Sequence, residues 1–351
     1  MATAVFGNAI GWAQFRILGG WKNIIGTVIA YTVALGSLMF VLARLNGTAA
    51  SVTYSFFLGI FLGLQVLAAL IYGSMRVSGA VRNDVTSGVI ESHRLMPVSP
   101  MSAVLGYLFG STFQAMWLFA ANFVLGAIAV SAAHLSMQSW VICNGVLLWF
   151  AMCIWTIVQF FGYRSTFGAM GGILVLIAGW WLIAGGGALL PVPALQVLFT
   201  PLIGHTIFDM RSGLGGIDKA YLVGGVGQLA IGWLYCLASA ERYRRDDLVG
   251  FNPVIAILLL GVVTAASLAG MLHPDWFMTF GRFRIAPMER ETAFEMSVIL
   301  VLLLAILPIS SAVRLSVVPP AGMTRRHLGP MLAVVGSFVI SMGLVLAPPP
   351  V

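Results

Sequence analysis

The sequence predicts an all-α polytopic membrane protein with about nine transmembrane helices, an N-terminal interfacial helix and a short cytoplasmic helix. Three observations predict this class. Only 8% of the 351 residues are charged, whereas 60% are hydrophobic, and soluble domains carry about 25% charged residues. Nine apolar runs are each long enough to cross a bilayer, which takes about 20 residues. One strongly polar segment separates two of these runs.

The segment before the first apolar run, residues 8–22, predicts an amphipathic helix lying on the membrane surface. Trp12, Phe15 and Leu18 recur at helical spacing, and Arg16 and Lys22 lie among them. Aromatic and basic residues together are typical of helices at the membrane interface. The alternative is that this segment extends the first span.

The apolar runs must form helices, because a backbone in lipid has to satisfy its hydrogen bonds internally and the runs lack the alternation of a barrel. The run at 101–133 exceeds the bilayer thickness, so we expect it to begin as a short helix at the cytoplasmic surface. The predicted spans lie near 24–45, 52–75, 101–133, 138–161, 167–190, 220–240, 252–272, 293–313 and 328–348.

A polar island, defined here as residues 81–100, lies between the second and third runs. It must lie in water, and residues 81–96 predict a short helix outside the bilayer. Pro97 would end that helix, and Pro100 lies where the chain returns to the membrane. Its charged or chargeable residues are Arg82, Asp84, Glu91, His93 and Arg94.

Basic residues give the orientation, because cytoplasmic loops carry an excess of Lys and Arg. With the N-terminus in the cytoplasm, 12 of the 18 basic residues fall on the inner side and 6 on the outer side. This bias accounts for the net charge of +7 without nucleic-acid binding. The inner set is Arg16, Lys22, Arg76, Arg82, Arg94, Arg164, Arg242, Arg244, Arg245, Arg314, Arg325 and Arg326.

The sequence lacks the motifs of several enzyme classes. Neither Lys22 nor Lys219 follows a glycine, so there is no phosphate-binding loop for ATP. The five histidines are far apart, and the three cysteines lie in apolar runs, which favours packing over a metal site or a disulfide. We expect no cofactor, no metal and no catalytic residue in this chain.

The spans carry neutral amides in place of mid-membrane carboxylates. Two interpretations remain open: hydrogen bonds between helices, or the lining of a polar translocation path. The candidate lining residues are Gln65, Gln114, Asn122 and Gln159.

The polar island resembles the cytoplasmic signature of type-2 ATP-binding-cassette (ABC) transporter permeases. That signature is an acidic residue, then Gly-Thr-Leu-Glu, then an apolar stretch and Pro-Leu-Ser. Asp84, Gly88, Glu91 and Pro97 match its spacing, while Val89 replaces the threonine and Ser92-His93-Arg94 replaces aliphatic residues. The resemblance covers about residues 8–247, including an apolar 191–219 segment similar to the outer re-entrant pair of such permeases.

The resemblance implies a permease subunit of an exporter in the bacterial cytoplasmic membrane, with a second permease half or a second copy beside it. A separate nucleotide-binding ATPase subunit would dock on the island as a coupling helix. Its contact residues would be Asp84, Gly88, Glu91, Arg94 and Pro97. We expect Gly88 to permit close backbone approach, Asp84 to favour the helix N-terminus, and Glu91 to pair with Arg94 or with the partner.

The chain would then divide into a six-span unit, residues 1–250, and three additional spans in 251–351. Their layout is similar to spans one and two and their loop, as in an incomplete second repeat. A competing hypothesis is a non-transporting structural subunit of a larger membrane complex. Both hypotheses place this chain in the lipid bilayer, and neither makes it an enzyme.

Overall fold

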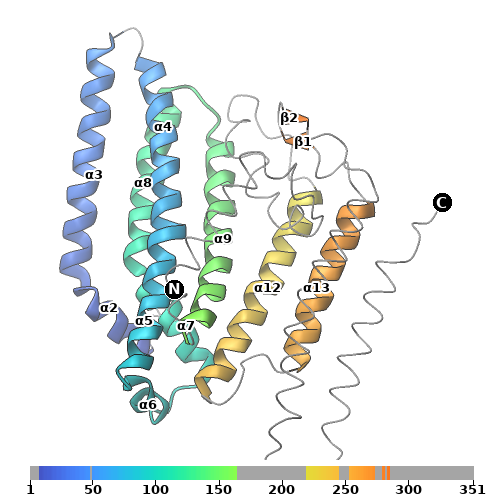
Figure 1. The fold of residues 1–351 in the computed structure, drawn as a ribbon. Coiled ribbons are helices and arrows are strands. Elements are labelled where there is room, and N and C mark those ends of the chain that lie inside the picture. The colour runs from blue at the N-terminus through green and yellow to red at the C-terminus, as the bar shows by residue number, and fades with distance from the viewer. Residues whose placement is uncertain are drawn as a thin grey trace, which may run out of the picture. The chain divides into compact units, whose positions relative to one another are not determined.

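The computed structural model describes residues 8–47, 50–163, 219–244, 253–272, 279–280 and 283–284. Apart from one pair of two-residue strands, the regular elements in these ranges are helices (Figure 1). Residues 8–163 belong to one compact unit and residues 219–284 to another.

Four helices in the described part of the chain are long and apolar enough to cross a membrane. They are Gly20–Leu45, Ala50–Thr86, Phe113–Ala132 and Met137–Gly162. The chain is therefore an integral membrane protein. Six of the nine predicted spans coincide with helices, and the other three, near 167–190, 293–313 and 328–348, lie outside the described residues, as does 191–218 of the expected re-entrant pair.

The first unit begins with α2 (Ala9–Ile17), which is separate from α3 (Gly20–Leu45). Asn8 caps α2, because its side chain accepts hydrogen bonds from the backbone N–H groups of Ile10 and Gly11. Gly19 and Gly20 both have positive φ, and they turn the chain sharply between the helices. The prediction of a distinct helix before the first span is thus confirmed, and its place on the membrane surface stays a prediction.

The second predicted span is longer than expected. Helices α4 (Ala50–Val66), η2 (Leu67–Tyr72) and α5 (Gly73–Thr86) form one continuous rod of 37 residues. The helix continues 11 residues beyond residue 75, where the predicted span ends, and Gly88 with positive φ follows it; where the chain leaves the membrane stays a prediction. The short helix α6 (Val89–Arg94) then follows, so 81–96 is not a single helix.

The π-helical turn η2 is explained by a tryptophan of a neighbouring helix. The indole Nε1 of Trp155 donates a hydrogen bond to the Ala69 carbonyl at 2.7 Å. A Cβ at Gly73 would lie 2.6 Å from that same Nε1, so only glycine leaves room for the ring. The widened turn therefore frees a carbonyl for a partner outside its own helix.

The third predicted span consists of two helices, as expected from its length. Helix α7 (Pro100–Ser111) starts with the Ser99 side chain as its cap, and α8 (Phe113–Ala132) follows after a break at Thr112. Helix α9 (Met137–Gly162) completes the described part of this unit.

The long helices of the first unit pack side by side, with α4 against α8, α5 against α9, and α3 against α4 and α8 (Figure 1). Their core contains Phe57, Phe61, Leu125 and Trp140. A Cβ at Gly126 would lie 2.1 Å from the Trp140 ring, so this glycine allows α8 and α9 to meet closely. Helices α2, α6 and α7 lie together at one end of the bundle.

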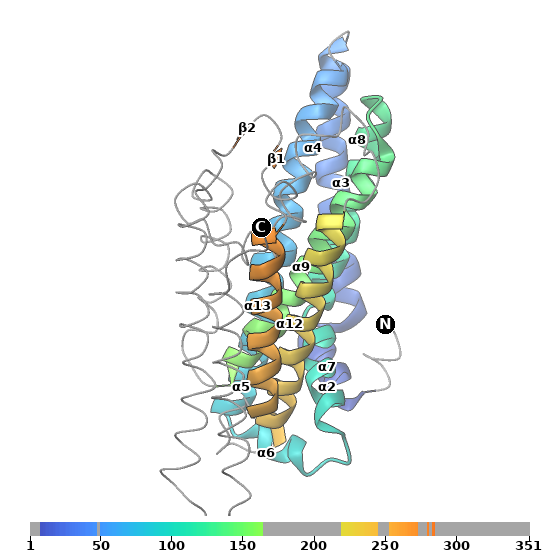
Figure 2. The ribbon, with the colours of Figure 1, turned by 90° about the vertical axis from the view of Figure 1, so that its right-hand side faces the viewer.

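The second unit contains α12 (Lys219–Arg244) and α13 (Pro253–Leu272), which pack against each other (Figure 2). Strands β1 (Thr279–Phe280) and β2 (Phe283–Arg284) pair antiparallel, which the sequence did not predict. The proposed boundary at residue 250 stays a prediction.

Candidate functional site

Helix α6 has an inner and an outer face. Ile90 and His93 are buried against the bundle, whereas Val89, Glu91 and the following Leu95 face solvent. Leu95 is 89% exposed. Helix α6 therefore packs against the bundle on one side and presents an apolar and acidic surface to solvent on the other.

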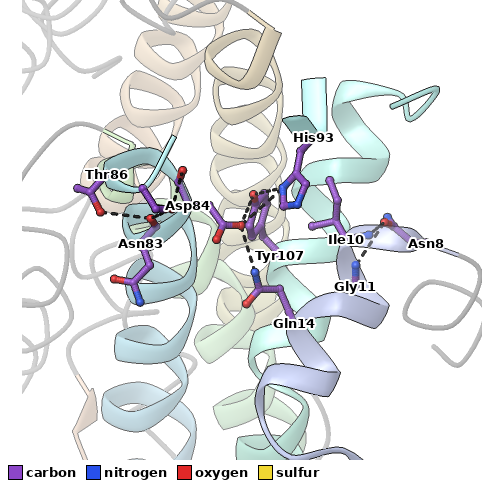
Figure 3. A network of polar contacts seen from close by, with 10 residues as sticks. Asn8, Ile10, Gly11, Gln14, Asn83, Asp84, Thr86, His93 and Tyr107 are labelled. Carbon is purple, nitrogen blue, oxygen red and sulfur yellow. Dashed lines mark hydrogen bonds and ion pairs between the residues drawn. The ribbon is translucent and has the colours of Figure 1, made fainter. Parts of the chain in front are cut away.

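A buried polar network fastens α6 to the bundle (Figure 3). The carboxylate Oδ2 of Asp84, in the last turn of α5, accepts a hydrogen bond from the Tyr107 hydroxyl at 2.7 Å and from Gln14 Nε2 at 3.2 Å. His93 Nδ1 lies 3.0 Å from the Tyr107 hydroxyl and 3.6 Å from Asp84 Oδ2. Four elements, α2, α5, α6 and α7, thus meet at one carboxylate.

The contacts assign the protons in this network. The Tyr107 hydroxyl has a single proton, and it donates that proton to Asp84 Oδ2. The Tyr107 oxygen then accepts from His93 Nδ1–H, which makes the Nδ1-protonated form of the ring the one that fits. The chain of donors runs from His93 through Tyr107 to Asp84.

A second set of contacts holds α2 against α7. The Asn8 side chain donates to the Ser102 carbonyl and, at 3.0 Å, to the Ser102 hydroxyl. A Cβ at Gly110 would lie 2.6 Å from the Gly11 carbonyl oxygen. The two backbones therefore touch, and α2 is bound to the helix that carries Tyr107.

The structure corrects one of the roles expected for the island and adds to another. Asp84 does not lie at the N-terminus of the short helix; it lies at the C-terminal end of α5, where buried hydrogen bonds outweigh an unfavourable helix dipole. Gly88 has φ +73, and a Cβ there would meet nothing within 4 Å. Gly88 is needed for the left-handed turn, and a close approach of a partner's backbone there stays a prediction.

The other island residues lie as the sequence suggested. Arg94 Nη1 donates to Glu91 Oε1 at 2.7 Å, and the Glu91 side chain is 61% exposed. Pro97 comes after α6 has ended at Arg94. Whether these residues contact an ATPase subunit stays a prediction.

The four amides of the candidate lining each bond to another helix, and each pair joins a different set of helices. This arrangement favours interhelical hydrogen bonds, and a translocation path stays a prediction. Gln65 Nε2 donates to Asn144 Oδ1; Tyr72 donates to Gln114 at 2.7 Å; Tyr31 donates to Asn122 at 2.7 Å; and Gln159 donates to the Val104 carbonyl at 2.9 Å.

Sequence reasoning missed Gln14 and Tyr107 and read His93 only as a polar residue in the island. One signal was available: Gln14 lies on the same face of α2 as the buried Ile10, and a polar residue on an apolar face needs a partner. Tyr107 carried no such signal, because it lies in a continuous apolar run.

The buried hydrogen bonds of this site hold α6 in a fixed position against α5, α7 and α2. Within the described ranges, no group of three or more His, Cys, Asp or Glu side chains is placed to bind a metal ion. Comparison of the chain with known protein families, characterised proteins and solved structures found no match.

Proposed function

We propose that this chain is the membrane-spanning permease subunit of an ATP-driven ABC-type exporter. In this proposal the chain has nine spans, its N-terminus is in the cytoplasm of a bacterial cell, and the subunit works with a second permease half or a second copy. The ATP is hydrolysed by a separate subunit, because the sequence has no phosphate-binding loop.

One observation carries the proposal: α6 is a short helix outside the long helices, buried on its inner face and exposed on its outer face. A docking partner would cover Val89, Glu91 and Leu95. Because His93, Tyr107 and Asp84 form one network, a displacement of α6 would be transmitted to α5, α7 and α2 together. The long rod from Ala50 to Thr86 would carry the displacement across the membrane.

The alternative is a structural subunit that transports nothing. It is favoured by the four span amides, which bond to neighbouring helices. Such a subunit would also use the exposed apolar surface of α3, which includes Ile25, Ile29 and Val33.

Affinity purification of the full chain from its native membrane in mild detergent distinguishes the two functions. We expect a near-stoichiometric subunit that carries a Gly-x-x-x-x-Gly-Lys-Ser/Thr motif, identified by mass spectrometry, together with ATPase activity. Recovery of a stable assembly of membrane proteins without any ATPase would contradict the permease function and support the structural one.

A further inference from the structure

The turn between α2 and α3, residues 18–23, has a fixed geometry and is called the elbow below. After α2 ends at Ile17, Gly19 and Gly20 turn the chain with φ of +89° and +62°. The Asn23 side chain closes the turn by donating to the Leu18 carbonyl at 2.8 Å. Helix α2 therefore meets α3 at a set angle at the end of the bundle (Figure 1).

Aromatic rings surround this elbow. The buried Phe15 ring lies 5.4 Å from Trp12, 5.4 Å from Trp21 and 5.2 Å from Phe113, and the Trp21 ring lies 6.2 Å from that of Trp117. The three indoles keep exposures of 41%, 40% and 43% for Trp12, Trp21 and Trp117. Half-exposed indoles are typical of the depth at which lipid headgroups meet hydrocarbon.

Two exposed cations lie at the same elbow. The Arg16 guanidinium lies 5.5 Å above the Trp12 ring, and Lys22 lies on the first turn of α3. A cation in the last turn of α2 stabilises that helix, but Lys22, in the first turn of α3, gains nothing from the helix dipole. The helix dipole therefore does not account for this charge, whereas a position at the cytoplasmic membrane surface does.

Among the residues that the structure describes, neither Arg16 nor Lys22 forms an ion pair with a carboxylate. The first 83 residues contain neither Asp nor Glu. Among the described residues the ion pairs are Asp84 with His93 and Glu91 with Arg94, and neither includes Arg16 or Lys22. Asp84, whose carboxylate contacts α2, accepts hydrogen bonds from Gln14 and Tyr107.

We propose that the α2–α3 elbow binds the headgroup of an anionic phospholipid. Arg16 and Lys22 hold the phosphate, with the Arg16 fork as hydrogen-bond donor, while the acyl chains lie along Ile17 and the exposed edge of Trp21. Charge complementarity and the interfacial indoles select a bilayer lipid over a soluble anion. This inference concerns the membrane anchoring of α2, and it holds for either proposed function.

The test is a titration of the detergent-solubilised full chain with dioleoyl phosphatidylglycerol, with bound lipids counted by intact-complex mass spectrometry. We expect one phosphatidylglycerol to bind in preference to dioleoyl phosphatidylcholine. Arg16→Gln/Lys22→Gln should weaken that binding by about 30-fold, as expected for two basic residues at an anionic surface. Arg44→Gln is the matched control, because Arg44 also lies over an aromatic ring, Phe40 at 5.1 Å, at the opposite end of α3.

A charge-conserving variant, Arg16→Lys/Lys22→Arg, keeps the test decisive if the glutamine variant fails to fold, since it should retain phosphatidylglycerol binding. Equal binding of the two lipids, or wild-type binding by a folded glutamine variant, would overturn the proposal. So would displacement of the lipid by millimolar inorganic phosphate, because that result would assign the elbow to a soluble anion.

Discussion

Replacing Asp84 by alanine is expected to destabilise the folded protein by about 3 kcal/mol, the order of magnitude for breaking a buried charged network. The substitution leaves the Tyr107 hydroxyl and the Gln14 amide without the acceptor at which they meet, and it removes the carboxylate 3.6 Å from His93 Nδ1. The free energy of unfolding, measured by denaturant titration of the purified chain, checks this value. Asp84→Asn should recover most of the loss, because it keeps an acceptor oxygen for Tyr107.

A double-mutant cycle tests whether these side chains act as one network. Tyr107→Phe alone removes the group between His93 and Asp84, so its cost should overlap with that of Asp84→Ala. We expect the double variant to lose about 1 kcal/mol less unfolding free energy than the sum of the losses of the two single variants. Glu91→Ala is the control, since its exposed pair with Arg94 contributes at most about 1 kcal/mol. Strictly additive costs would contradict the network.

Glu91→Arg is expected to release the proposed ATPase subunit while leaving the chain folded in the membrane. In the unsubstituted chain the exposed Glu91 carboxylate accepts a hydrogen bond from Arg94 on the outer face of α6. The substitution replaces that carboxylate with a second cation beside Arg94. Losing one charge of a pair at an interface costs about 2 kcal/mol or more, which weakens docking by roughly 30-fold. Quantitative mass spectrometry of the purified complex measures the retained ATPase.

The matched control for Glu91→Arg is Ser51→Arg, which adds an exposed cation at the start of α4, the end of the bundle opposite α6 (Figure 1). It should leave the amount of bound ATPase unchanged. A Glu91→Arg variant that retains the subunit at the wild-type level would mean that the outer face of α6 is not the docking surface.

The positions of the described spans could be predicted from the sequence, because lipid requires long uninterrupted apolar runs. The length of the helix that contains the second span could not. We expect the chain to leave hydrocarbon near Arg76 and Arg82, but backbone hydrogen bonds continue the helix to Thr86. The π-helical turn also has no local signal, because the distant Trp155 and Gly73 produce it.

The candidate site was predictable only in its local part. Glu91 and Arg94 pair because they are three residues apart on one helix. Gly88 was recognised as special for a close approach, but the left-handed turn that it makes was not predicted. The partners of Asp84 come from residues 14, 93 and 107, and packing of four separate elements, which no sequence period encodes, brings them together.

Photo-crosslinking from position 95 tests the central claim most directly. Leu95 is 89% exposed beside α6, so a crosslinking residue there samples whatever docks on the outer face. Position 52, where Val52 is 69% exposed near the start of α4, is the control. In intact cells we expect position 95 to yield a product with an ATP-hydrolysing subunit and position 52 to yield none. A product from position 95 that contains only lipids or membrane-spanning proteins would contradict the account.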